Sequence, residues 1–171
     1  GRGRINAAVF HSTYEDLQVS TFDGNADFVV GNAAESVVTG LEADWTFAVT
    51  EHLILSGALA LLHAEYDSFP DSGCTSTQVT AWVAAGNPRA TCTQDLSGRQ
   101  LQFAPDWAAN IAARYIRPIG NDLELGLSVD INASDDTVIA ADGDALLDQK
   151  AHEKINARIS LGTTNGEWLF A

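Results

Sequence analysis

The sequence predicts an all-β protein, an antiparallel up-and-down sheet of about seven strands of the kind that crosses a membrane as a segment of a β-barrel. Apolar residues alternate with small or polar residues in several stretches, which is the pattern of a strand with two different faces. Most of these stretches reach the roughly 9–11 residues that a tilted strand needs to cross a bilayer. The connections between them are alternately long and short, as in an up-and-down barrel with short turns at one end.

The first strand is predicted over residues 4–18, and a polar stretch with a turn signal at Asp23-Gly24 follows it. The chain resumes near Phe28 and leads into a hairpin over residues 36–69. In that hairpin the odd positions are mostly apolar, whereas the even positions are small or polar. One face of the sheet is therefore predicted to be apolar and the other polar.

The turn of this hairpin is predicted near Thr50, between strands that end and begin at about residues 48 and 52. That turn would place Trp45 opposite Leu55 and Leu41 opposite Leu59. A slip of one residue would carry charged side chains to the apolar face, so the parity of the pairing is strongly specified.

Three further strands are predicted over residues 101–116, 123–132 and 155–162, and a seventh begins after a tight turn at residues 163–166. In the last hairpin, Leu161 is expected opposite Trp168 and Ile159 opposite Phe170. Long polar loops separate the third strand from the fourth and the fifth from the sixth.

If the sheet lies in a membrane barrel, its apolar face meets lipid and its polar face lines the lumen. Aromatic residues near the ends of the apolar face would then anchor the barrel at the two interfaces. The polar residues predicted to face the lumen are Glu42, Asp44, Asn110, Arg114, Asp130, Asn156 and Arg158. The aromatic residues predicted to face lipid are Trp45, Phe47, Trp107, Tyr115, Trp168 and Phe170.

The two cysteines, Cys74 and Cys92, lie in the long polar loop between the third and fourth predicted strands. Two thiols alone do not make a structural zinc site, which takes four ligands. A disulfide that closes this loop, formed in an oxidising compartment, is the better interpretation.

Several function classes find no support in the sequence. The net charge of −14 offers no basic surface for nucleic acid. No nucleophile elbow or other catalytic spacing occurs, so neither an enzyme nor catalytic residues are predicted. The acidic stretch ADGDALLD (residues 141–148) lacks the ligand spacing of an EF-hand, and no metal site or cofactor is predicted.

Three stretches, in order, carry a resemblance to one family. They are INAAVFHSTYEDLQV (residues 5–19), GLEADWTFAVTEHLILSGALALLHAEYDSF (residues 40–69) and GRQLQFAPDWAANIAARYIRP (residues 98–118). Taken in this order, the three stretches are similar to consecutive strands of TonB-dependent outer-membrane receptors. The resemblance implies that residues 1–171 are part of a 22-stranded barrel, with the plug domain and the remaining strands elsewhere. The absence of Met and the ending EWLFA favour an excised segment over a processed mature protein.

The resemblance also implies a function for the parent protein. Such receptors lie in the bacterial outer membrane and import scarce nutrients, such as ferric siderophores or vitamin B12, with energy from the TonB complex. The expected partners are therefore outer-membrane lipid, a small molecule or chelate, and TonB through the N-terminal part. Two alternatives stay open: a self-contained small pore or structural barrel, and a secreted soluble β-module that binds a ligand through its long loops.

Overall fold

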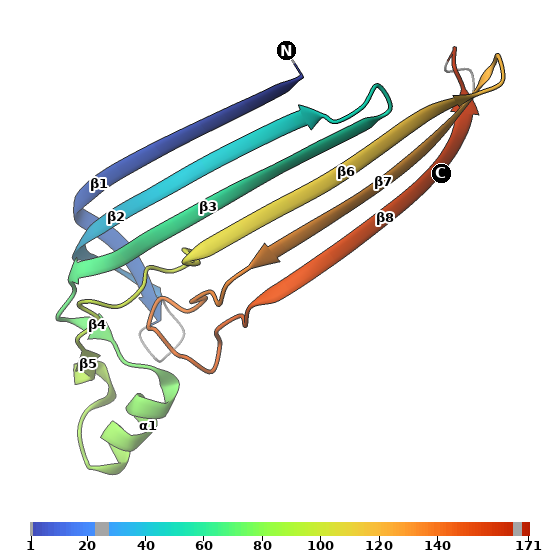
Figure 1. The fold of residues 1–171 in the computed structure, drawn as a ribbon. Coiled ribbons are helices and arrows are strands. Elements are labelled where there is room, and N and C mark those ends of the chain that lie inside the picture. The colour runs from blue at the N-terminus through green and yellow to red at the C-terminus, as the bar shows by residue number, and fades with distance from the viewer. Residues whose placement is uncertain (1, 23–27, 166–168) are drawn as a thin grey trace.

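The computed structural model describes residues 2–22, 28–165 and 169–171 and forms one curved antiparallel sheet with long loops at one end (Figure 1). Neighbouring strands follow the chain in order, β1-β2-β3-β6-β7-β8-β9, so the up-and-down prediction is confirmed. The strands of this sheet are β1 (Gly3–Phe22), β2 (Phe28–Ala48), β3 (Leu53–Ser68), β6 (Trp107–Ile119), β7 (Leu123–Ser134), β8 (His152–Thr163) and β9 (Leu169–Phe170).

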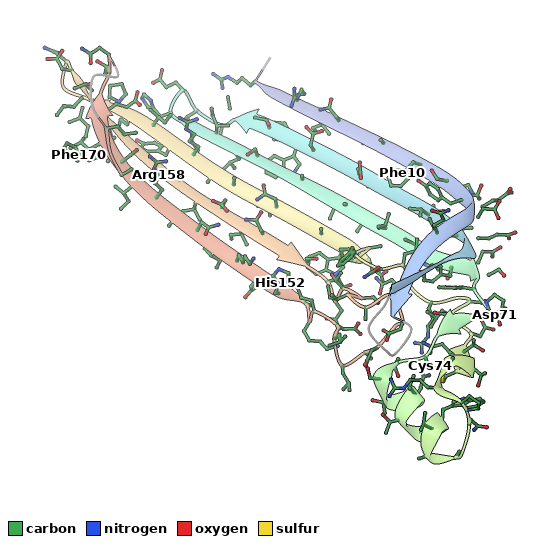
Figure 2. The ribbon with its side chains drawn as sticks, turned by 180° about the vertical axis from the view of Figure 1, so that it is seen from behind. Phe10, Asp71, Cys74, His152, Arg158 and Phe170 are labelled. Carbon is green, nitrogen blue, oxygen red and sulfur yellow. A yellow bond between two sulfur atoms is a disulfide. The ribbon has the colours of Figure 1, made fainter. Side chains whose placement is uncertain are left out.

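Short turns lie at one end of the sheet and long loops at the other (Figures 1 and 2). Strands β2 and β3 are joined by residues 49–52, and β6 and β7 by residues 120–122. Gly120 has a φ of +66°, a backbone conformation that glycine adopts without a steric penalty. The two long connections are loop A (residues 69–106) and loop B (residues 135–151).

The register of the two predicted hairpins is displaced by two residues. Leu41 lies opposite Leu61, not Leu59, and Trp45 lies opposite Gly57. The turn is centred one residue later than predicted, because the Thr50 hydroxyl accepts the backbone N–H of Leu53 at 3.0 Å and fixes a longer loop. A displacement of two preserves the faces, since side chains alternate with period two.

The last hairpin shows the same displacement. Leu161 lies opposite Phe170, where Trp168 was predicted, and Trp168 itself is outside the described residues. Because the displacement is again two residues, Phe170 stays on the face where the alternation places it.

Two strand boundaries also differ from the prediction. Strand β6 begins at Trp107, six residues later than predicted, because Phe103 has a φ of +60° and Pro105 lacks a backbone N–H. The connection between β1 and β2 is shorter than predicted, since the two strands remain paired up to Phe22 and Phe28. The predicted turn at Asp23-Gly24 lies outside the described residues. Register shifts between Tyr14 and Gln18 accompany a bend in β1 (Figure 1).

Loop A is folded, although the sequence suggested only an irregular polar connection. It contains the helix α1 (Ser76–Ala84), the 3₁₀ turn η1 (Arg89–Thr91), and a small sheet of β4 (Ser72–Gly73) and β5 (Thr93–Gln94). Thr75 and Gln78 form a reciprocal capping box at the start of α1. Among the described residues, no helix has the length and apolar character required to cross a membrane.

The only cluster of buried hydrophobic side chains in the described part of the chain lies where the loops meet the sheet. Tyr66, Phe69 and Leu96 form its centre, and Leu17 and Ala141 pack against it. The two loops are therefore held on the sheet by hydrophobic contact. Elsewhere the described strands form a single layer, and no other described element covers either face of it (Figure 1).

The odd-numbered side chains form an apolar face with high exposure. Val9 is 76% exposed, Ile155 66% and Ile159 69%. A soluble sheet covers such a face with a second layer, because exposed contiguous apolar surface favours association. This face therefore requires an apolar environment.

The sheet is open. No strand ladder joins β1 to β8 or β9 among the residues that the structure describes. Unpaired backbone N–H and C=O groups at such an edge cost several kcal/mol each in lipid, and in water they recruit other chains.

We therefore expect a polypeptide of only these 171 residues to aggregate in aqueous buffer and to disperse in detergent. Light scattering during gel filtration measures this directly. A stable monomer without detergent would contradict the expectation and would favour the soluble-module alternative.

Candidate functional site

The even-numbered side chains form the polar face of the sheet, opposite the apolar face. Strand registers place Asp44 opposite Ala58, Ala58 opposite Asn110 and Asn110 opposite Asn132. Paired residues point to the same side of a sheet. All seven polar residues selected from the sequence share this face: Glu42, Asp44, Asn110, Arg114, Asp130, Asn156 and Arg158.

Asp44 is at the centre of the first polar cluster on this face. Its two carboxylate oxygens accept hydrogen bonds from Asn6 Nδ2, each at 3.0 Å, and it forms an ion pair with Arg4 at 3.5 Å. The neighbouring Glu42 carboxylate forms no hydrogen bond or ion pair within the described residues. Cross-strand pairing thus occupies Asp44 but leaves Glu42 available.

Asp130 is at the centre of the second cluster. Its Oδ2 accepts hydrogen bonds from Asn132 Nδ2 and Asn156 Nδ2, both at 2.8 Å. Asn110 Nδ2 donates in turn to Asn132 Oδ1 at 2.8 Å. Asn156 thus contacts Asp130 directly, and Asn110 is joined to Asp130 through Asn132, which the list of predicted lumen residues omitted although its number is also even.

A groove of about 630 Å³ lies between the two clusters. Ala58, Ala60 and Ala108 form its floor, and the two polar clusters and His152 lie along its sides. The small side chains of Ala58 and Ala60 create this depression, since their partners on β2, Asp44 and Glu42, are longer. The groove is therefore mostly apolar at its floor, with polar side chains along its sides.

Arg114 and Arg158 flank Ser128 in one row across β6, β7 and β8. Asp130, the nearest acid on the same face of β7, is bonded to two asparagines. No ion pair of either arginine with another described residue is found. The two cations lie closer to the short turns than the groove does (Figure 2 shows Arg158).

The apolar face carries the predicted aromatic residues that the structure describes. Trp45 and Phe47 pack together at 5.7 Å between ring centroids, and Trp45 covers Gly57, where an added Cβ would meet the indole at 2.6 Å. Trp107 is the first residue of β6, and Tyr115 lies four residues before its last residue, Ile119. Phe170 shares this face through its pairing with Leu161.

Cys74 and Cys92 form a disulfide, as predicted, with their Cα atoms 5.7 Å apart. The bridge closes the part of loop A that contains α1 and η1. Figure 2 shows Cys74 at the loop end, far from Phe170 at the end of the short turns.

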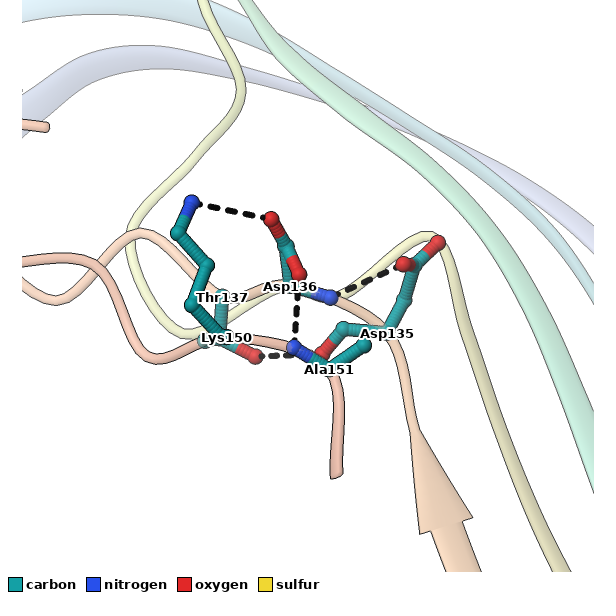
Figure 3. Close-up of polar contacts among 5 residues, drawn as sticks. All are labelled: Asp135, Asp136, Thr137, Lys150 and Ala151. Atoms are coloured by element: carbon teal, nitrogen blue, oxygen red, sulfur yellow. Dashed lines mark hydrogen bonds and ion pairs between the residues drawn. The ribbon is translucent and has the colours of Figure 1, made fainter. Parts of the chain in front are cut away.

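Polar contacts join the two ends of loop B, residues 136–137 and 149–151, which together form its neck (Figure 3). Thr137 and Gln149 exchange two backbone hydrogen bonds of 2.8 and 3.0 Å. The Asp136 carboxylate accepts the backbone N–H of Ala151 at 2.6 Å and the Lys150 ammonium at 3.1 Å. These bonds favour the charged carboxylate and lower the pKa of Asp136 below its ordinary value.

The neck of loop B is therefore expected to depend on pH. A lowered carboxyl pKa stabilises the closed neck above the ordinary pKa of aspartate, near 3.8, and this contribution is lost as the pH falls through the folded value. We expect the hydrogen-exchange protection factor of the Ala151 amide to fall below pH of about 4. Asp136→Asn should lower protection at neutral pH and remove the pH dependence, whereas Asp67→Asn should retain it. An unchanged profile in Asp136→Asn would contradict this account.

The described part of the chain contains no group of three or more His, Cys, Asp or Glu side chains able to hold a metal ion. The sequence prediction missed Arg4, Asn6, Asn132 and His152 on the polar face. Asn6 and Asn132 have even numbers within the predicted strands, and this would have assigned them to the polar face.

Comparison with known proteins gives a consistent result. The family model described as TonB dependent receptor-like, beta-barrel matches residues 1–165. No protein with a curated description matches. Three solved structures, described next, are 15 to 18% identical to this chain, and a likeness at that level shows the fold alone. The chain spans about a fifth of the length of each of them.

Three solved structures are similar over nearly the whole chain. The ferric yersiniabactin uptake receptor FyuA from Yersinia pestis has a TM-score of 0.66 and 15% identity, over 97% of this chain and 21% of that one. The siderophore receptor PiuA from Acinetobacter baumannii has a TM-score of 0.57 and 18% identity, over 97% and 20%. The ferric preacinetobactin receptor BauA from the same organism has a TM-score of 0.60 and 17% identity, over 94% and 20%.

Proposed function

Because the chain belongs to the family of TonB-dependent receptor-like β-barrels, we propose that it supplies seven neighbouring strands of an outer-membrane transporter. The single observation that carries this proposal is the two-faced sheet, with an exposed apolar face, a polar face, and long loops gathered at one end. Lipid would cover the apolar face, and the polar face would line the lumen. Residues 1–171 would thus be part of the barrel domain, with the plug and the other strands encoded elsewhere.

The proposed activity is uptake of a scarce nutrient, such as a ferric siderophore or vitamin B12, energised by the TonB complex. The three similar structures are described as a ferric yersiniabactin uptake receptor, a siderophore receptor and a ferric preacinetobactin receptor, which supports a chelate as the substrate class. No catalytic role is proposed. The open sheet and the family match argue against a self-contained small pore and against a secreted soluble module.

The polar face has two proposed roles in the lumen. The hydrogen-bonded clusters around Asp44 and Asp130 keep the inner wall polar and hydrated. Glu42, Arg114 and Arg158, whose charges are not paired within the described residues, would contact the plug or a passing solute. Trp45, Trp107, Tyr115 and Phe170 would anchor the apolar face at the membrane interfaces.

Uptake measurements test the proposal. Deletion of the gene that encodes this chain should abolish uptake of at least one member of a panel of radioiron-labelled ferric siderophores or labelled vitamin B12. Deletion of tonB should abolish the same uptake, and the cloned gene should restore it only in cells that contain TonB. Uptake that persists without TonB would contradict the proposed transport mechanism.

A further inference from the structure

On strands β1 to β3, the apolar face ends toward the long loops in a row of polar side chains, His11, Thr39 and His63, which we call the histidine row. We propose that its two histidines bind the phosphate group of an anionic lipid in the outer leaflet, and bind it more tightly at mildly acidic pH. The proposal deepens the proposed function and rests on it, because it requires lipid against the apolar face.

Strand register places the three residues of the row side by side. His11 is paired with Thr39 and Thr39 with His63, so their side chains leave the sheet on the same side. The next row of this face toward the short turns consists of exposed apolar residues, Val9, Leu41 and Leu61. Figure 2 shows Phe10, the residue before His11, near the bend of β1 at the loop end. The histidine row therefore continues the apolar face outward.

The row lies just beyond a length of strand that can cross a bilayer. On β3 the odd positions from Leu53 to Leu61 are all leucine or glycine, and this span is close to the roughly 9–11 residues that a tilted strand needs. Leu61 is paired with Trp107, which is proposed to mark the membrane interface. His63 follows Leu61 by two residues on the same face. It is therefore placed at the depth of the lipid headgroups.

Printed contacts orient both imidazole rings and leave one nitrogen of each ring for a ligand. The His11 Nδ1 atom lies 2.8 Å from the Thr39 hydroxyl oxygen, which leaves Nε2. The His63 Nε2 atom lies 3.6 Å from a carboxylate oxygen of Glu65, which leaves Nδ1. Both histidines are exposed, and a protonated imidazole has an N–H donor at each nitrogen. Each ring can thus donate to a phosphate oxygen without losing its present contact.

Positive charge on this part of the apolar face comes from the histidines alone. In the described residues of β1, β2 and β3, the only lysine or arginine is Arg4, and it forms an ion pair with Asp44 on the polar face. Histidine ordinarily gains its charge as the pH falls below about 6.5. The row therefore becomes complementary to an anionic lipid in that range of pH.

The acids near the row strengthen the dependence on pH. Glu65, the next residue outward on the same face of β3, stabilises the protonated form of His63. The other acids near the loop end of these strands are Glu15, Asp16, Glu35, Asp67 and Asp106. While both imidazoles are neutral, these carboxylates repel an anionic headgroup. Protonation of the row is therefore required for tight binding.

Native mass spectrometry of the complete receptor, released from detergent micelles, resolves individual bound lipids and tests the proposal. The probe is phosphatidylglycerol, whose single negative charge is constant over this range, and phosphatidylcholine with the same chains is the comparison. We expect phosphatidylglycerol to bind roughly fivefold or more tightly at about pH 5.5 than at about pH 8, since one basic side chain near an anionic lipid contributes roughly fivefold in affinity. Phosphatidylcholine should show no such change.

His11→Gln and His63→Gln should each weaken phosphatidylglycerol roughly fivefold at about pH 5.5 and leave its affinity at about pH 8 unchanged. Replacement of both histidines by lysine should give tight binding at both pH values. His152→Gln, at a histidine on the polar face, is the matched control and should retain the pH dependence.

A spin label on a cysteine introduced at Leu61 separates this proposal from the proposed function. If oxygen, which concentrates in lipid, relaxes that label but phosphatidylglycerol binds equally at both pH values, the proposal is overturned and the lipid-facing assignment stands. A label relaxed only by a water-soluble nickel chelate would overturn both. Unchanged binding in the receptor with both His11→Gln and His63→Gln, or displacement of the lipid by an equal concentration of inorganic phosphate, would also overturn the proposal.

Discussion

Ile111→Arg is expected to lower the free energy of unfolding of the complete barrel in a lipid bilayer by about 2–4 kcal/mol, the cost of a charge on the lipid face near the midplane. Ile111 is 56% exposed on the apolar face of β6. It lies midway along the strand between Trp107 and Tyr115, the aromatic residues proposed to mark the two interfaces. A charge at this position is therefore as far from water as the strand allows.

The matched control is Ala112→Arg, at the next residue of the same strand. Ala112 lies on the polar face opposite Asp130, so the new side chain meets an opposite charge, and such a pair contributes roughly 0.2–1 kcal/mol. Urea unfolding of the barrel in lipid vesicles, followed by tryptophan fluorescence, compares the two variants. Equal destabilisation, or a larger effect in Ala112→Arg, would contradict the assignment of the two faces.

Replacement of both cysteines, Cys74→Ser with Cys92→Ser, is expected to destabilise the closed part of loop A by about 3 kcal/mol, the chain-entropy estimate for a loop of this size. The bridge spans 18 residues and encloses α1 and η1. Inside it, Trp82 Nε1 donates to the carbonyl of Pro88 at 3.1 Å, but Trp82 is 39% exposed. Hydrophobic burial inside the ring is therefore small, and the disulfide is the main constraint there.

The strands should retain their structure in this double variant. Phe69 and Leu96 pack outside the ring, and the backbone N–H of Phe69 donates to the Ser97 hydroxyl at 2.8 Å. Hydrogen exchange followed by mass spectrometry should show lost protection in residues 74–92 and unchanged protection in β6 and β7. Mass measurement without reductant provides the control for the bridge in the unaltered protein. Loss of protection throughout the strands would show that the bridge stabilises the whole sheet.

Strand order, face and loop placement were predictable from the sequence, because each depends on a local pattern. The alternation of Leu123, Leu125 and Leu127 with Glu124 and Gly126 determines which side each residue takes. The sequence predicted which face each paired residue takes but not which two residues lie opposite each other. Alternation specifies odd or even pairing, but the length of the turn depends on bonds such as Thr50 Oγ1 to Leu53 N–H, which the pattern does not encode.

The folded state of loop A was not predictable from periodicity. Its helix has nine residues and one buried side chain, Val79, so it lacks a pronounced apolar stripe. The available signal was the Thr75 and Gln78 spacing of a capping box. A cavity of about 260 Å³ between loops A and B was missed for a different reason. Two of its lining residues, Arg99 and Asp148, are distant in sequence, and contacts between the two loops bring them to the same cavity.

In strands β3, β6, β7 and β8, we propose that the odd-numbered residues face lipid and the even-numbered residues face the lumen of a barrel. Spin labels on single cysteines introduced at each position of β7, from Leu123 to Ser134, test it most directly in the complete receptor in lipid vesicles. We predict that oxygen, which concentrates in lipid, relaxes labels at odd positions, and that a water-soluble nickel chelate relaxes labels at even positions. Access of the chelate to both sets of positions, without a period of two, would contradict the account.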